Sequence, residues 1–123
     1  MKYLCLAYYD ERKFDALPKD ELDALVTRCK THDRALRESG SLRLVGSLAR
    51  PKDSKSIRPQ KGCAIVTDGP YAETKEQIGA FFIVEANDLA EAAAQASKHP
   101  AAVLGDEVGW GIEVRPIEYF DQP

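Results

Sequence analysis

Residues 2–9, at the start of the chain, read KYLCLAYY. This run is rich in tyrosine and leucine and lacks helical spacing, so it predicts a β-strand. Residues 80–84, AFFIV, predict another strand of the same kind. Both runs are apolar at odd and even positions, whereas a sheet with one free face alternates apolar and polar residues. A bare apolar sheet face would be an unusually large exposed patch, so we expect a second copy of the chain to cover it.

Two helices are expected to pack on the sheet. The first begins at about Pro18, because proline suits the first helical position, and ends at Gly40. The second is capped by Asp88, with Glu91 three residues later as in a capping box, and is stopped by Pro100. The first helix carries an apolar stripe at helical spacing, made of Leu22, Leu25, Val26, Cys29 and Leu36.

The run at 80–84 belongs to a strand expected over residues 79–86. The other strands are expected at residues 42–48, 63–67 and 112–118, with a short extended piece at 56–59. The order is therefore β-α-β, further β, then α-β. This order predicts an α+β fold with the ferredoxin-like split arrangement, in which two helices lie on one face of an antiparallel sheet. The 123 residues match the usual size of one domain and show no linker or repeat, so a single domain over residues 1–123 is expected.

Composition excludes several classes of function. The net charge is −3 and no basic block occurs, so direct nucleic-acid binding is not expected. No window is apolar enough to span a membrane, and the N-terminus lacks the pattern of a signal peptide. The three cysteines, Cys5, Cys29 and Cys63, are far apart and unpaired in pattern, which indicates reduced thiols in the cytoplasm. No metal-ligand spacing and no phosphate-binding glycine motif is present, so no metal or cofactor is predicted.

The most distinctive motif is the turn Asp68-Gly69-Pro70-Tyr71, followed by the polar segment Glu73-Thr74-Lys75. Glycine supplies unusual backbone angles, proline fixes the next one, and the aspartate can bond to nearby backbone N–H groups. One interpretation is a structured hairpin loop with solvated charges. The alternative is that Asp68, Glu73, Thr74 and Lys75 line a cleft.

Asp33 and His32 are the most interesting side chains outside that loop. Asp33 falls within the apolar stripe of the first helix, and His32 falls at its edge. A carboxylate there is costly unless it is paired, so one interpretation is a structural pair with Arg58 or the backbone. The other is a general acid or base with a shifted pKa. His99 is expected to cap the C-terminal end of the second helix, where positive charge is favoured, and a catalytic role is the alternative.

These motifs resemble the DGPF branch of the YCII-related proteins. The resemblance rests on the opening strand, on Arg58, on the Thr67–Tyr71 turn, which has tyrosine where phenylalanine is usual, and on the segment Glu73–Gln77. Further matches are Lys98–Ala101, Gly109–Gly111 and Glu113–Ile117. Departures are Ala80, where glycine is common, and Asp106–Glu107, where an acid followed by histidine is common.

The resemblance implies a ferredoxin-like fold, a homodimer of the dimeric α+β barrel type, and a cleft in which a histidine and an aspartate can meet. We expect a small-molecule binder capable of metal-free acid–base chemistry such as isomerisation or elimination. The alternative is a regulatory accessory protein that binds a protein partner, linked to extracytoplasmic-function sigma factors. The candidate catalytic residues are Asp33, His32 and Asp68, and the candidate ligand-binding residues are Arg58, Lys75, Glu73, Thr74 and Arg115. Trp110, between two glycines, is expected either to close the cleft or to pack on the dimer.

Overall fold

The main sheet of the computed structural model, which describes residues 1–123, has four strands in the order β2-β5-β1-β6. These are β1 (Lys2–Asp10), β2 (Leu42–Ser47), β5 (Glu76–Glu85) and β6 (Gly111–Pro116). Every neighbouring pair is antiparallel. The two apolar runs found in the sequence are the two central strands, and their register places Cys5 opposite Phe82. The protein is therefore an α+β protein built on an antiparallel sheet.

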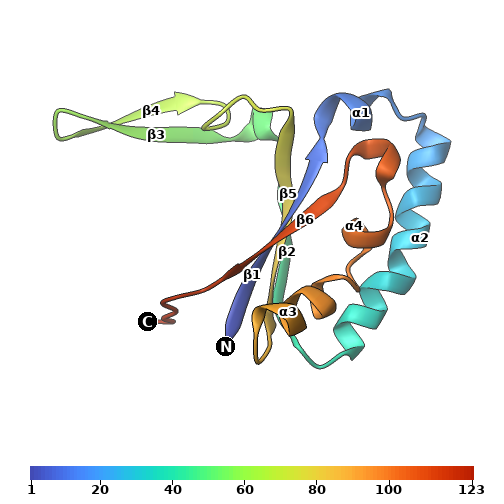
Figure 1. Cartoon of the computed structure of the whole chain (residues 1–123). Coiled ribbons are helices and arrows are strands. Elements are labelled where there is room, and N and C mark those ends of the chain that lie inside the picture. The colour runs from blue at the N-terminus through green and yellow to red at the C-terminus, as the bar shows by residue number, and fades with distance from the viewer.

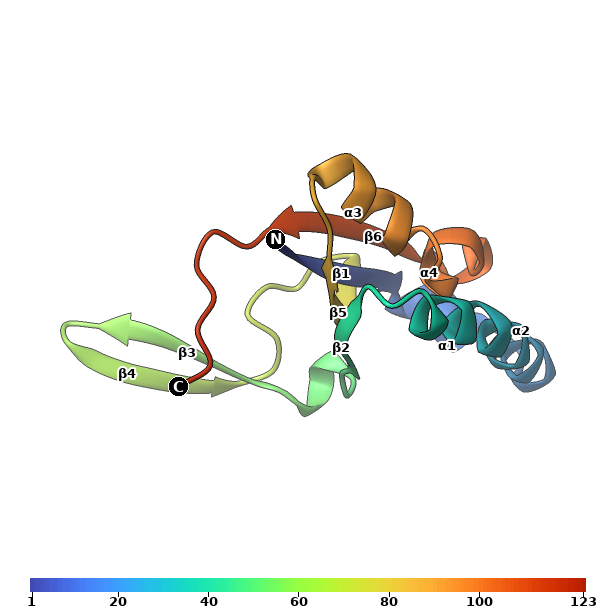
Figure 2. The same ribbon diagram turned by 90° about the horizontal axis from the view of Figure 1, so that it is seen from below.

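The helices all lie on one face of this sheet (Figures 1 and 2). They are α1 (Glu11–Ala16), α2 (Lys19–Glu38), α3 (Leu89–Ala96) and α4 (Pro100–Val103), with 3-10 turns η1 (Pro51–Asp53) and η2 (Asp106–Val108). Asp88 caps α3 as predicted, because its side chain accepts a hydrogen bond from the Glu91 backbone N–H at 2.8 Å. No helix is both long and apolar enough to cross a membrane.

The core lies between the sheet and helices α2 and α3. Phe82, Val84 and Cys5 are fully buried on the helix-covered face, and Leu36 of α2 is buried with them. Ala92 and Ala96 of α3 complete the cluster, because their small side chains allow this helix to approach the sheet closely.

The opposite face of the sheet carries no helix but is also apolar. Leu4 and Leu6 of β1 alternate with the buried residues and are only partly exposed. Their cross-strand neighbours include Ile83 and Phe81 of β5. The two-faced apolar pattern of the sequence thus agrees with the positions of these side chains.

A separate two-stranded hairpin projects from the body of the molecule (Figure 1). Its strands, β3 (Lys55–Gln60) and β4 (Cys63–Asp68), are joined by a turn with positive φ at Lys61 and Gly62. Such a turn matches the twist of a hairpin. We call residues 55–68 the arm. Ser56 is its only buried residue, and Ile57 and Val66 are 60% and 55% exposed.

Three elements differ from the sequence prediction. Helix α1 was not predicted, because its six residues are too few to show a helical period; Asp10 caps it by accepting hydrogen bonds from Arg12 and Lys13. The second predicted helix ends at Ala96, with Ser97 as its C-cap, and Pro100 begins α4 instead, since proline is well suited to a first helical turn. The strand at 63–67 and the extended piece at 56–59 were expected without an assigned pairing, and in the structure they form the arm, which pairs only with itself.

Candidate active site

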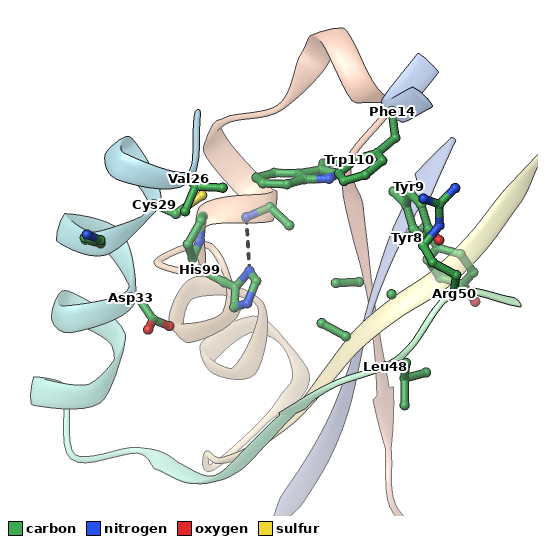
Figure 3. A pocket seen from close by; sticks show the side chains of 16 residues that line it. Tyr8, Tyr9, Phe14, Val26, Cys29, Asp33, Leu48, Arg50, His99 and Trp110 are labelled. Carbon is green, nitrogen blue, oxygen red and sulfur yellow. Dashed lines mark hydrogen bonds between the residues drawn. The ribbon is translucent and has the colours of Figure 1, made fainter. Parts of the chain in front are cut away.

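A pocket of about 480 Å³ lies between α2 and the helix-covered face of the sheet (Figure 3). Ten of its sixteen lining residues are hydrophobic, which suits a small organic ligand. The lining residues are Ala7, Tyr8, Tyr9, Phe14, Val26, Cys29, Lys30, Asp33, Leu48, Arg50, Gly79, Ala80, His99, Pro100, Ala101 and Trp110.

The pocket exists because small residues lie next to each other in the part of the sheet that α2 does not contact closely. Ala7 of β1 lies directly opposite Ala80 of β5, so neither strand sends a large side chain into the space. Gly79 is required next to them, since a Cβ there would lie 2.9 Å from Cδ1 of the Tyr9 ring. Helix α2 packs on α4, and its contacts with the strands are sparse.

Helix α2 presents Val26, Cys29, Lys30 and Asp33 to the pocket, at the three- and four-residue spacing of one helix face. The apolar stripe predicted for this helix is therefore divided between two roles. Leu25 and Leu36 are fully buried, whereas Val26 is 51% exposed and lines the pocket. Hydrophobic periodicity alone does not separate a core position from a pocket wall.

His99 is held in one orientation by two contacts. Its Nδ1 accepts a hydrogen bond from the backbone N–H of Ala101 at 3.0 Å, which caps α4. Its ring stacks on Phe82 with centroids 4.6 Å apart and planes at 5°. Burial lowers the pKa of His99 from its usual 6.5, although the carboxylate of Asp33 opposes this shift. The bond to Nδ1 acts in the same direction as burial, because that nitrogen must be unprotonated to accept it.

The predicted role of His99 as a positively charged C-terminal cap is wrong. Its imidazole caps the N-terminus of the next helix and favours the neutral form. The sequence contained a signal for this, because a residue that precedes proline at the first helical position is an N-cap candidate.

Asp33 faces the pocket from α2, on the same side of the cavity as His99 (Figure 3). The structural pair with Arg58 does not form. Instead, Oδ2 of Asp33 accepts a long hydrogen bond of 3.5 Å from Nε of Arg37, one turn further along the helix. The Asp33 side chain is 43% exposed, so this surface ion pair is weak.

The other end of the pocket is formed by Arg50, Tyr9 and Phe14 (Figure 3). Nη2 of Arg50 donates to Glu11 at 3.1 Å and to Asp15 at 2.9 Å, so two carboxylates balance one guanidinium. The guanidinium also lies 5.2 Å from the centre of the Phe14 ring. Burial raises the pKa of Tyr9, and the charge of Arg50 opposes that shift.

Trp110 lines the pocket, and its indole lies against the backbone of Gly105. A Cβ at Gly105 would overlap Cε3 of the indole, and the residue has φ of 80°. Glycine is therefore needed there for both space and backbone conformation.

The other predicted site residues lie outside the lining of this pocket. His32 is half-buried on α2, and Arg115 on β6 pairs with Glu113 at 3.5 Å. Asp68 and Arg58 belong to the arm, while Glu73, Thr74 and Lys75 lie in the exposed loop that follows it. Of the eight predicted residues, the structure of one chain places only Asp33 at the pocket.

Contacts within the arm, and from the arm to the loop that follows it, explain much of the turn from Asp68 to Tyr71. Asp68 accepts from Lys55 at 2.6 Å across the hairpin, and the guanidinium of Arg58 lies 4.0 Å from the centre of the Tyr71 ring. Arg58 also donates to the Tyr71 carbonyl oxygen at 2.9 Å. Gly69 has φ of 99°, which favours glycine. These residues fix the path of the loop from the arm toward β5.

Apart from Asp33, no residue of the pocket lining was predicted as a site residue, and the residues missed include Arg50, Tyr9, Ala7 and Ala80. Arg50 and Tyr9 gave no signal because their partners come from different segments of the chain. The two alanines gave none because a small residue in a strand becomes a pocket floor only when the facing helix stands away. No group of three or more His, Cys, Asp or Glu side chains is arranged to hold a metal ion.

Comparison with known proteins identifies the class. Residues 1–120 match the YCII-related domain family. The chain is also 35% identical over 92 residues to the uncharacterized protein R00369 of Rhizobium meliloti (strain 1021). That similarity covers 75% of this chain and 74% of the relative. The protein therefore belongs to the YCII-related domain family.

Proposed function

We propose that the pocket binds a small molecule and that Asp33 and His99 act on it as an acid–base pair. The observation that carries this proposal is the placement of both groups on one side of a largely apolar cavity. A carboxylate and a neutral imidazole in such a cavity are suited to proton transfer.

The reaction type that these groups allow is isomerisation or elimination through an enol. Asp33 takes a proton from a carbon next to a carbonyl group, and the C–H electron pair moves into the new carbon–carbon double bond. Nε2–H of His99 donates a hydrogen bond to the carbonyl oxygen as negative charge develops there. In an isomerisation, Asp33 passes this proton to the carbonyl oxygen, which leaves an enol hydroxyl group hydrogen-bonded between Asp33 and His99. In an elimination, the carbonyl double bond re-forms as the bond to a leaving group on the next carbon breaks, and that group departs with the bonding electron pair and takes the proton from Asp33.

A thermal-shift screen of small carboxylates, phenols and lactones tests the binding proposal. A ligand that uses the pocket raises the melting temperature of the wild type and has a smaller effect on Asp33→Asn. Asp20→Asn is the matched control, because Asp20 is exposed on the same helix and does not line the pocket. A broad library without a single stabilising compound would overturn the proposal.

We also propose the finer structural class. If the arm is set aside, the order β2-β5-β1-β6 corresponds to the ferredoxin-like split arrangement. The turn from Asp68 to Tyr71 and its contacts to Arg58 support membership of the DGPF branch. Three free cysteines, with Cys63 exposed, support a reducing compartment such as the cytoplasm.

A homodimer is proposed to form through the free face of the sheet. Leu4, Leu6 and Phe81 are partly exposed and give this face an apolar surface that no helix covers. The arm supports the same proposal, because an isolated two-stranded hairpin is marginally stable in water unless it packs on something. Sedimentation at micromolar concentration tests it, and the mass of a single chain would rule the dimer out.

The second candidate function is a regulatory accessory protein that binds another protein. The exposed Ile57 and Val66 of the arm favour it, since apolar side chains on a projecting element suit a protein partner. Amide hydrogen exchange measured in the homodimer distinguishes an arm that packs within the homodimer from an arm that is free to bind another protein. Protected amides in β3 and β4 assign the arm to the homodimer, whereas fast exchange leaves it free for a different protein.

A further inference from the structure

The polar groups at the Asp33 end of the pocket define what a ligand must offer them. Nδ1 of His99 accepts from Ala101, so in the neutral imidazole the proton is on Nε2. Nε2 has no hydrogen-bond partner within the chain and is not fully buried. It is therefore accessible within the pocket. His99 therefore offers one donor, in a direction fixed by the stack on Phe82.

Asp33, in contrast, offers the ligand only hydrogen-bond acceptors. An ionised carboxylate only accepts hydrogen bonds, and the one bond that it accepts, from Arg37, is long at 3.5 Å. The ligand atom that satisfies both residues must accept from Nε2 of His99 and donate to Asp33. A hydroxyl group does both with a single oxygen.

The charges around the pocket argue against an anionic ligand. Arg50 is already compensated by Glu11 and Asp15, which bind the same nitrogen. Lys30 is the one lining cation without a carboxylate partner, and it is exposed to solvent. Asp33 itself repels a carboxylate, and the apolar walls disfavour any unpaired charge.

We propose that the ligand is an uncharged molecule with an apolar body and a hydroxyl group seated between Asp33 and His99. This inference rests on the proposed function of the pocket and adds the chemical class of its ligand. The hydroxyl group donates to the Asp33 carboxylate and accepts from Nε2–H of His99.

Three ring-matched probes test the ligand class by isothermal titration calorimetry near neutral pH. The probes are 4-propylphenol, which has the hydroxyl group, 4-propylanisole, which keeps the acceptor but has no donor, and 4-propylbenzoate, which is anionic. We expect 4-propylphenol to bind about tenfold more tightly than 4-propylanisole, the size of one charge-assisted hydrogen bond, and 4-propylbenzoate to bind most weakly. Quenching of Trp110, the one tryptophan of the chain, places the probe in the pocket.

Two substitutions test whether the preference for 4-propylphenol over 4-propylanisole depends on Asp33 and His99. Asp33→Asn removes the charge, and His99→Asn keeps an N-cap acceptor for Ala101 while removing Nε2. Each is expected to reduce the preference for 4-propylphenol over 4-propylanisole by at least several-fold, while Asp20→Asn leaves it unchanged. Binding of 4-propylanisole is expected to change little in all three variants.

The outcomes separate the ligand class from the pocket function. Equal binding of the phenol and the anisole, or tightest binding of the benzoate, would overturn the assignment of a hydroxyl group to the ligand. The proposal that the pocket binds a small molecule would still stand. A preference that survives both substitutions would also overturn it. Absence of binding by all three probes, with no hit in the wider thermal-shift screen, would overturn the pocket function and the ligand class together.

Discussion

The imidazole of His99 lies parallel to the ring of Phe82, with centroids 4.6 Å apart, and the same imidazole caps α4 through Ala101. One side chain thus joins the core of the sheet to the wall of the pocket. Because Phe82 is fully buried, the ring of His99 has little freedom to rotate. The orientation of Nε2 is therefore set by the core.

This dual role predicts the stability of His99 variants. His99→Ala loses the stack and the cap, and the expected cost is about 2 kcal/mol of unfolding free energy. His99→Asn retains a cap acceptor and should recover part of that loss. Urea denaturation of the three proteins measures both values, and an unchanged midpoint for His99→Ala would contradict the assignment.

The same histidine predicts a pH dependence of stability. Burial lowers the folded-state pKa of His99 below 6.5, so the unfolded chain binds more protons as the solution is acidified. The stabilisation is therefore fully present above about pH 6.5 and is lost as pH falls toward the folded pKa. Asp33 on α2 is the charged group that opposes the shift, and the uncharged Phe82 faces the ring from β5. Urea midpoints at several values from pH 7.5 to 5 should fall more steeply for the wild type than for His99→Asn.

The three cysteines should differ in their reaction with a thiol reagent. Cys63 is exposed on the arm and should react first. Cys29 lines the pocket and burial raises its pKa, so it should react slowly, and more slowly still with 4-propylphenol bound. Burial raises the pKa of Cys5 to about 12, so Cys5 should react only after unfolding. Mass spectrometry of labelled peptides over time gives the order, and early labelling of Cys5 would contradict the core packing.

Gly105 should control the position of Trp110. Gly105→Ala introduces a Cβ into the space occupied by the indole, so we expect Trp110 to move and its emission to shift to longer wavelength. Gly40→Ala is a matched control, because Gly40 has the same φ of 80° but no atom within 4 Å of a built Cβ. Both variants should lose about 1–2 kcal/mol from backbone strain, and only Gly105→Ala should change the fluorescence.

The proposed dimer predicts the effect of a charge on the free sheet face. Leu6→Asp places a carboxylate opposite Phe81, where a second copy is proposed to pack, and should give single chains in sedimentation. Leu89→Asp is the control, because Leu89 is exposed on α3, on the other face of the sheet. If both variants sediment as the wild type does, the free face is not the interface.

Much of the fold could be predicted from the sequence because its signals are local. The central strands were visible as apolar runs, Pro18 and Gly40 bracketed α2, and Asp88 marked the start of α3. Each of these signals acts over a few residues: a cap bonds to its own helix, and a strand is defined by its own composition. Helix α1 was not predicted, because its six residues are too few to show a helical period.

The candidate site could be predicted only in part. Asp33 was found because a carboxylate in an apolar stripe is costly and therefore conspicuous. Its proposed partner His99 lies on a different helix, and the sequence indicated neither their approach nor the tautomer of the imidazole. Asp68 was favoured because its turn is distinctive, but in the structure it pairs with Lys55 within the arm.

By itself, then, the sequence determined the strands, the main helices and the apolar character of both sheet faces, because propensity, capping and periodicity are properties of neighbouring residues. Tertiary structure alone decided where the cavity lies. The pocket depends on Ala7 and Ala80 meeting across two strands while α2 rests on α4, and on Phe82 holding the ring of His99. These are contacts between residues far apart in the chain, and only packing in three dimensions brings them together.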